Sequence, residues 1–109
     1  MDIKKLAENL ELDLEEFSEI FEIYIETTSS DLQELKAALR DGDAKRAHEK
    51  THSIKGSSGN LGIDELYELA KQIDDRARVN SLNGLEDLVR NFDEIYKRLV
   101  EEFEKSRSS

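Results

Sequence analysis

The sequence predicts an all-α domain, an antiparallel up-and-down four-helix bundle with a short extra N-terminal helix. Its 109 residues suit one domain, and they include no proline and only five glycines. Glu, Lys, Leu, Ala and Arg, which favour helices, dominate the composition, while Val, Thr and the aromatic residues are sparse. Apolar residues recur at steps of three and four, which is the spacing of one helix face.

A short first helix is expected over residues 2–10, and a long second helix follows from Leu14. The apolar stripe of this second helix keeps its phase through residues 27–30, which favours one continuous helix. A break there stays open as an alternative, because Ser30 followed by Gln33 resembles a capping box. The inward residues of the second helix are predicted to be Leu14, Phe17, Phe21, Ile25, Thr28, Leu32, Leu35 and Leu39.

Three turns divide the rest of the chain. Gly42 suits the left-handed position that ends a helix, and Asp43 suits the N-cap of the next one. Residues 60–62 and 80–84 form the other two turns. The third helix has mostly small inward residues, so it can pack close to its neighbours. The inward residues of the last three helices are predicted to be Ala44, Ala47, Thr51, Ile54, Ser58 and Leu61; Ile63, Leu66, Ala70, Ile73 and Ala77; and Leu85, Leu88, Phe92, Ile95, Leu99 and Phe103.

Short connections between these helices predict antiparallel neighbours. The short first helix is expected to pack across one end of the bundle. We assign residues 1–104 to the domain and expect residues 105–109 to form a flexible tail. A bundle of this size closes its own core, which favours a monomer.

The net charge of -10 disfavours nucleic acids and anionic membrane surfaces, because binding to either depends on Lys and Arg. Proteins are therefore the expected partners. The chain has no cysteine, which excludes disulfides, thiol nucleophiles and Cys-based metal sites. Its start lacks an apolar signal segment, and no run is long enough to cross a bilayer, so we expect a cytoplasmic location.

Residues 48–62 depart from ordinary helix composition. A second stripe, one residue away from the apolar one, contains His48, His52, Lys55, Gly59 and Gly62. His52 and Lys55 are about one turn apart and point the same way. The run from Gly56 to Gly59 lies inside the predicted helix, where each glycine costs about 0.5–1 kcal/mol relative to alanine. Either a partner approaches this backbone closely, or the glycines allow close helix–helix packing.

The segment from His52 to Gly62 (HSIKGSSGNLG) resembles the signature of histidine phosphotransfer domains, including those of chemotaxis-type histidine kinases. The signature is His, two residues, Lys-Gly, two small residues and an apolar-Gly pair. The match covers eleven contiguous residues, and the helical pattern extends it over essentially the whole chain. The resemblance implies that His52, and not His48, accepts a phosphoryl group on the exposed side of a bundle helix.

The resemblance also assigns supporting residues. Neutral imidazole is a good nucleophile, and an ordinary histidine pKa of about 6.5 leaves it mostly neutral at cytoplasmic pH. Lys55 would counter the charge of the phosphoryl group, and Gly56, Ser57 and Gly59 would form the surface that a partner approaches closely. Asp74 lies where chemotaxis-type members carry an acidic residue that hydrogen-bonds the histidine.

Arg78 lies one turn beyond Asp74, where some members of these families carry an arginine near the phosphoryl site. The alternative is that Asp74, Asp75, Arg76 and Arg78 form an ordinary solvated face. Motif transfer this far from the signature is weak, so the sequence leaves both interpretations open.

The expected role is that of a carrier and not of an enzyme. The chain has neither a phosphate-binding P-loop nor a kinase-type glycine loop. The partners would therefore bring the chemistry, and the chain would need no cofactor of its own. A response regulator receiver would supply its phospho-aspartate and Mg²⁺, and a sensor histidine kinase is the alternative donor.

Two other functions compete with this one. His48, Glu49 and His52 match the zinc-peptidase motif His-Glu-x-x-His, in which two histidines bind the metal and the glutamate is the base. Against it, the chain has only two histidines and no clear strand to hold a peptide substrate. The other alternative is a helical adaptor that is never phosphorylated, because a fold does not fix a function.

Overall fold

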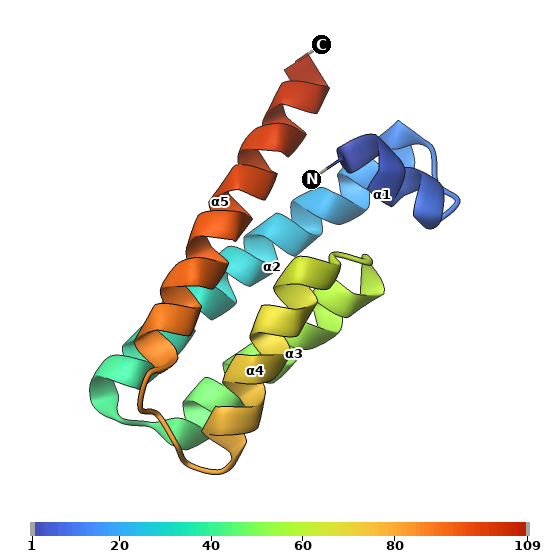
Figure 1. The fold of residues 1–109 in the computed structure, drawn as a ribbon. Coiled ribbons are helices and arrows are strands. Elements are labelled where there is room, and N and C mark those ends of the chain that lie inside the picture. The colour runs from blue at the N-terminus through green and yellow to red at the C-terminus, as the bar shows by residue number, and fades with distance from the viewer. Residues whose placement is uncertain (1, 109) are drawn as a thin grey trace.

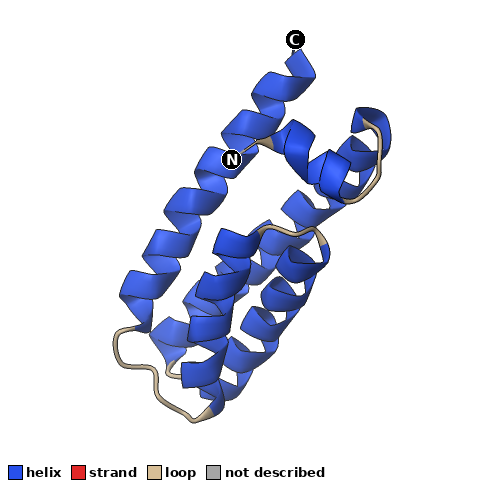
Figure 2. Cartoon of the chain, turned by 45° about the vertical axis from the view of Figure 1, so that its right-hand side comes forward, coloured by secondary structure: helices blue, strands red, loops and turns tan. Residues whose placement is uncertain are grey.

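The computed structural model describes residues 2–108, and every regular element among them is a helix (Figure 2). This confirms the all-α class and the short additional N-terminal helix. The helices follow one another along the chain as α1 (Ile3–Asn9), α2 (Leu14–Asp41), α3 (Ala44–Asn60), α4 (Asp64–Arg78) and α5 (Leu85–Ser108) (Figure 1).

Local sequence accounts for where the helices begin and end. Asp13 and Glu16 form a reciprocal capping box at the start of α2. Gly42 ends α2 with a φ of 68°, in the left-handed region that glycine adopts without strain. The Asp43 carboxylate then accepts from the backbone N–H of Arg46 and caps α3. Between its caps α2 runs unbroken for 28 residues, so the prediction of one continuous helix is confirmed.

The four long helices form a ring in chain order, in which α3 contacts α2 and α4, and α5 contacts α4 and α2. α2 and α5 are longer than the α3–α4 hairpin and project beyond it at one end (Figures 1 and 2). α1 lies across that end and contacts α2 and α5. The molecule measures 42 × 22 × 18 Å, and its longest dimension is about the length of a 28-residue helix.

The core is apolar and continuous from α1 to α5. Most of the predicted inward residues are buried, but Leu14 is 49% exposed because it is the first residue of α2, at the edge of the bundle. On α5 the buried stripe passes through Val89, while Leu88 beside it is only half-buried. The largest fully buried side chains are Phe17, Phe21, Phe92, Phe103, Leu35, Ile54, Ile63, Leu66, Ile73, Leu85 and Leu99.

Close packing between α2 and α3 depends on small side chains, as predicted. The side chain of Ser58 is fully buried, and its Oγ lies 2.9 Å from the Tyr24 hydroxyl on α2. Burial raises the pKa of Tyr24 to about 12, in spite of its hydrogen bond with Ser58. The phenol therefore stays protonated at physiological pH and ties α3 to α2.

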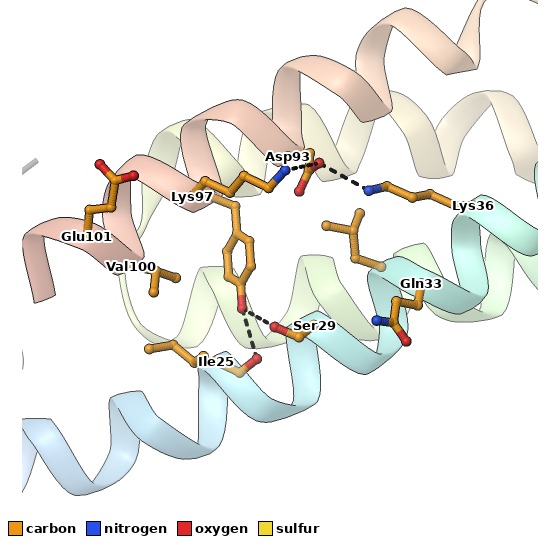
Figure 3. A pocket seen from close by; sticks show the side chains of 10 residues that line it. Ile25, Ser29, Gln33, Lys36, Asp93, Lys97, Val100 and Glu101 are labelled. Carbon is orange, nitrogen blue, oxygen red and sulfur yellow. Dashed lines mark hydrogen bonds and ion pairs between the residues drawn. The ribbon is translucent and has the colours of Figure 1, made fainter. Parts of the chain in front are cut away.

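The seam between α2 and α5 forms an open groove of about 460 Å³, lined by both apolar and charged side chains. Figure 3 shows Lys36 of α2 and Lys97 of α5 reaching the same carboxylate, that of Asp93, at 3.1 and 3.2 Å. The Tyr96 hydroxyl donates to the backbone oxygen of Ile25 at 2.8 Å. This groove belongs to the α2–α5 side of the ring, whereas the motif of residues 52–62 begins on α3.

The C-terminal segment differs from the expected flexible tail. α5 continues from residue 105 to Ser108, and residue 109 lies outside the described part of the chain. In this last part of α5, the Arg107 guanidinium pairs with Glu22 of α2 at 2.7 Å and lies over the Phe103 ring. Among residues 2–108, no helix combines the length and the apolar character that a membrane span requires.

Candidate functional site

His52 lies on the outer face of α3, and 67% of its side chain is exposed. The helical repeat explains this position, because Thr51 and Ile54 occupy the buried face of the same helix. His48 lies one turn before His52, with the two ring centroids 5.8 Å apart. Lys55 lies about one turn after His52, and its side chain is 23% exposed. α3 therefore presents two imidazoles and one ammonium along a single flank.

Asp74 of α4 connects these three groups, although its own side chain is only 1% exposed. Its Oδ1 accepts from His48 Nδ1 at 2.6 Å, and its Oδ2 accepts from Lys55 Nζ at 3.0 Å. His52 Nδ1 lies 3.7 Å from the same Oδ2, which is too long for a hydrogen bond but close enough for electrostatic attraction. One buried carboxylate thus faces both histidines and the lysine.

The partners of Asp74 keep it ionised. Burial alone would raise the pKa of this carboxyl, but hydrogen bonds from Lys55 and His48 outweigh burial and hold the pKa below its ordinary value. A negative charge beside His52 Nδ1 favours a proton on that nitrogen. The lone pair of the neutral ring then lies on Nε2, on the other side of the imidazole from Asp74. The geometry therefore provides an exposed nitrogen nucleophile.

The glycines of the motif have different surroundings. A Cβ at Gly56 would meet no atom within 4 Å, so packing within the chain does not require a glycine there. A Cβ at Gly59 would lie 3.0 Å from the Tyr67 ring of α4, so close packing accounts for Gly59. Ser57 is half-buried, and its hydroxyl donates to the backbone oxygen of Ile54. The bare backbone next to His52 is therefore that of Gly56.

The two α4 residues singled out from the sequence lie in different surroundings. Asp74 is buried within the cluster, so the interpretation of a solvated face fails for this residue. Arg78 is exposed and pairs with Asp75 at 3.2 Å, on the surface of α4. A role for Arg78 near the phosphoryl group stays a prediction, because this ion pair does not connect it to His52.

Sequence reasoning missed the part that His48 plays in this cluster. The family signature assigned no role to His48, whose side chain is 35% exposed, yet this residue makes the shortest contact with Asp74. The sequence offered one indication, the spacing of four residues between His48 and His52, which places both on one flank. The sequence did not indicate how α4 is aligned along α3, and this alignment places Asp74 beside His48.

The arrangement of side chains also bears on the peptidase alternative. Within residues 2–108, no group of three or more His, Asp or Glu side chains is placed to hold a metal ion. Glu49, the general base of that alternative, is exposed on α3. His48 Nδ1 is already engaged with Asp74.

Fold and site together define a helical-bundle domain built around one exposed histidine with a buried carboxylate and a lysine behind it. The family model described as Hpt domain matches residues 19–106. The chain therefore belongs to the Hpt domain family, which confirms the resemblance carried by the motif at residues 52–62.

A solved structure supports the same assignment. The chain is similar to histidine-containing phosphotransfer protein B (HptB) from Pseudomonas aeruginosa PAO1, with 26% sequence identity and a TM-score of 0.86. The alignment covers 99% of this chain and 94% of that one. A comparison with curated proteins found no match.

Proposed function

We propose that this chain is a phosphocarrier, which accepts a phosphoryl group on His52 from a receiver phospho-aspartate and passes it to another receiver. The observation that carries the proposal is the placement of His52, whose Nδ1 faces the buried Asp74 carboxylate while most of the ring is exposed. Membership of the Hpt family and the likeness to HptB support it. We place this exchange in the cytoplasm, and we propose a sensor histidine kinase as the alternative donor.

The transfer needs one bond to form and one to break. The lone pair on His52 Nε2 attacks phosphorus, and the bond between phosphorus and the aspartyl oxygen breaks, which returns the receiver's aspartate to a carboxylate. The imidazole then carries the phosphoryl group on Nε2 and a proton on Nδ1, so the ring is positively charged. Asp74 Oδ2, 3.7 Å from Nδ1, stabilises that charge. Transfer to the second receiver reverses these steps.

Lys55 is the residue that we expect to neutralise the phosphoryl group. At 4 Å and an effective dielectric constant of 20, one such pair contributes about 4 kcal/mol before desolvation. Lys55 lies along the same helix flank as His52, and its ammonium is held near the site by Asp74 at 3.0 Å. The receiver supplies the Mg²⁺ and the remaining positive charge, so the chain acts as a carrier and its partners provide the catalysis.

An apolar patch beside the motif gives the receiver a place to dock. Ile20 and Ile23 are exposed on α2, three residues apart. Helical spacing puts them on the same side of α2 as Asp31 and Glu34. Both of these residues contact α3: Asp31 accepts from Ser53, and Glu34 pairs with Lys50 and Arg46. We define these two isoleucines as the docking patch, which lies on the α3 side of α2 and therefore borders the helix that carries His52.

The proposal is tested by mixing the protein with a phosphorylated receiver and Mg²⁺ and measuring the intact mass before and after mild acid. We expect the wild type and His48→Gln to gain one phosphoryl group that acid removes, and His52→Gln to gain none. A gain that persists in His52→Gln would contradict the assignment. If no variant gains mass from several receivers or from a histidine kinase, the adaptor is the better explanation.

A further inference from the structure

The shortest contact of Asp74 is with His48 and not with the proposed phosphoacceptor. His48 Nδ1 lies 2.6 Å from Oδ1, whereas His52 Nδ1 lies 3.7 Å from Oδ2. Because Asp74 is ionised and can only accept, His48 Nδ1 carries the proton and donates a hydrogen bond to the carboxylate. This bond fixes the orientation of the carboxylate and leaves Oδ2 facing Lys55 and His52.

The charged partners of Asp74 change during the transfer. Asp74 is a buried anion, and such a group is stable only with a cation or several donors beside it. In the resting protein Lys55 provides that cation at 3.0 Å. In the transfer proposed above, the same ammonium turns towards the phosphoryl group on His52. Asp74 then faces the cationic His52 ring, but His52 Nδ1 lies 3.7 Å away, beyond hydrogen-bond distance, so His48 is its remaining hydrogen-bond partner.

We propose that His48 is a positioning residue for the transfer at His52, which acts through Asp74 in two ways. It holds Oδ1, and it takes up a proton to become a second counter-ion of Asp74, besides the phosphorylated His52 ring, when Lys55 turns to the phosphoryl group. The proton comes from solvent, which reaches the ring because its side chain is 35% exposed. The proposal deepens the proposed function and rests on it.

The charged groups around His48 support this role for Asp74. On α3 the His48 ring lies beside the His52 ring, and from α4 it is contacted by Asp74, which also binds Lys55. Further along α4, Arg78 is paired with Asp75. Two α2 carboxylates contact α3 at other residues: Asp31 accepts from Ser53, and Glu34 pairs with Lys50 and Arg46. Asp74 is therefore the anion to which the charge on His48 responds.

The counter-ion role can be tested without phosphorylation. The ring signals of His48 are followed by NMR across pH in the unphosphorylated wild type, Lys55→Met and the double variant Lys55→Met/Asp74→Asn. Removing the ammonium imitates its departure, so the titration midpoint of the ring should move up by about one pH unit in Lys55→Met. In the double variant, the titration midpoint of His48 should not rise above that of the wild type. An unchanged midpoint in Lys55→Met would overturn the proposal, and circular dichroism checks that each variant is folded.

The positioning role is tested by the rate of phosphoryl uptake between pH 6 and pH 9. In His48→Asn, the amide nitrogen takes the place of Nδ1 but cannot become charged, and His48→Leu loses the bond altogether. We expect a bell-shaped profile for the wild type, loss of its alkaline limb in His48→Asn, and uptake about tenfold slower in His48→Leu at neutral pH. Equal rates and profiles in all three proteins would refute the role of His48.

The proposed function and the role of His48 can be contradicted separately. If the wild type takes up no phosphoryl group while the midpoint of His48 still moves in Lys55→Met, the proposed function is wrong and the linkage between His48, Lys55 and Asp74 stands. If the wild type is phosphorylated and the midpoint does not move, the proposed function stands and the role of His48 is wrong.

Discussion

At the scale of single residues, Asp74 is the anion around which the basic side chains of the candidate site gather. It is buried, it is ionised, and three cationic or potentially cationic side chains surround it. Its local sequence, two acidic residues followed by arginine on an amphipathic helix, is also typical of a solvated surface. Asp74 is buried in spite of this sequence because α4 packs against α3, which places the carboxylate beside His48, His52 and Lys55.

The contribution of Asp74 to stability should depend on pH. Because the folded-state pKa of Asp74 is lowered, its contribution is present above the ordinary aspartate pKa of about 3.9 and is lost as the pH falls through the folded-state value. We expect Asp74→Asn to reduce the free energy of unfolding by about 2 kcal/mol at pH 7 and by much less at pH 3. Urea denaturation at the two pH values measures this, and an equal loss at both would contradict it.

Gly56 should show opposite effects on stability and on transfer. Its Cβ position is open, and its helix is regular, so Gly56→Ala should raise the free energy of unfolding by about 0.5–1 kcal/mol. The added methyl group lies next to the proposed phosphoacceptor and should slow phosphoryl uptake from a receiver. Gly59→Ala is the matched control, because the Tyr67 ring at 3.0 Å opposes the gain in stability. Faster or unchanged uptake in Gly56→Ala would remove the reason for a glycine at that position.

At the scale of helices, the contact between α2 and α3 holds the motif in place. The hydrogen bond between the Tyr24 and Ser58 hydroxyls is a buried polar contact between these two helices. Tyr24→Phe keeps the ring but leaves the Ser58 hydroxyl buried without that partner, so we expect the free energy of unfolding to fall by about 1–2 kcal/mol. Thermal and urea denaturation measure the loss. The double variant Tyr24→Phe/Ser58→Ala removes both polar groups and should recover part of the stability, whereas a further loss would show that the bond is not the cause.

The docking patch on α2 should affect recognition without affecting the fold. Ile23 is 64% exposed, so Ile23→Ser should leave the melting temperature almost unchanged. Loss of its buried area in the complex should raise the Kd for a receiver by about fivefold. Val79 is the matched control, because it is 71% exposed but lies at the end of α4. Titration calorimetry compares the two variants, and an equal effect of both would argue against a local docking patch.

Several elements were predictable because their causes are local. Asp13, Gly42 and Asp43 set the ends of α2 and α3 through hydrogen bonds and backbone preferences within a few residues. His52 and Lys55 share a flank because of the helical repeat alone. The alignment of α4 on α3 depends on contacts between distant residues, so the sequence pattern did not specify the partner of His48.

At the scale of the whole molecule, a long-range contact also lies at the C-terminal end, where the structure differs from the prediction. Residues 105–109 have the composition of a tail, yet α5 continues to Ser108, and Arg107 in this part of the helix pairs with Glu22 of α2. The number of helices and their order were predictable from periodicity, since each helix has one apolar face that must be buried. The charged residues that pair between α5 and α2 do not recur with a regular spacing, so periodicity did not predict their pairing.

The exposure of His52 has a consequence for how long a signal lasts. A side chain that is 67% exposed on a rigid helix has no lid over it among the described residues. In the proposed function, water and every receiver reach the phosphorylated ring equally, so the protein stores the group without sealing it. The duration of the stored state is then set by the intrinsic lifetime of the P–N bond and by the concentration of free acceptor, and not by a conformational step of the bundle.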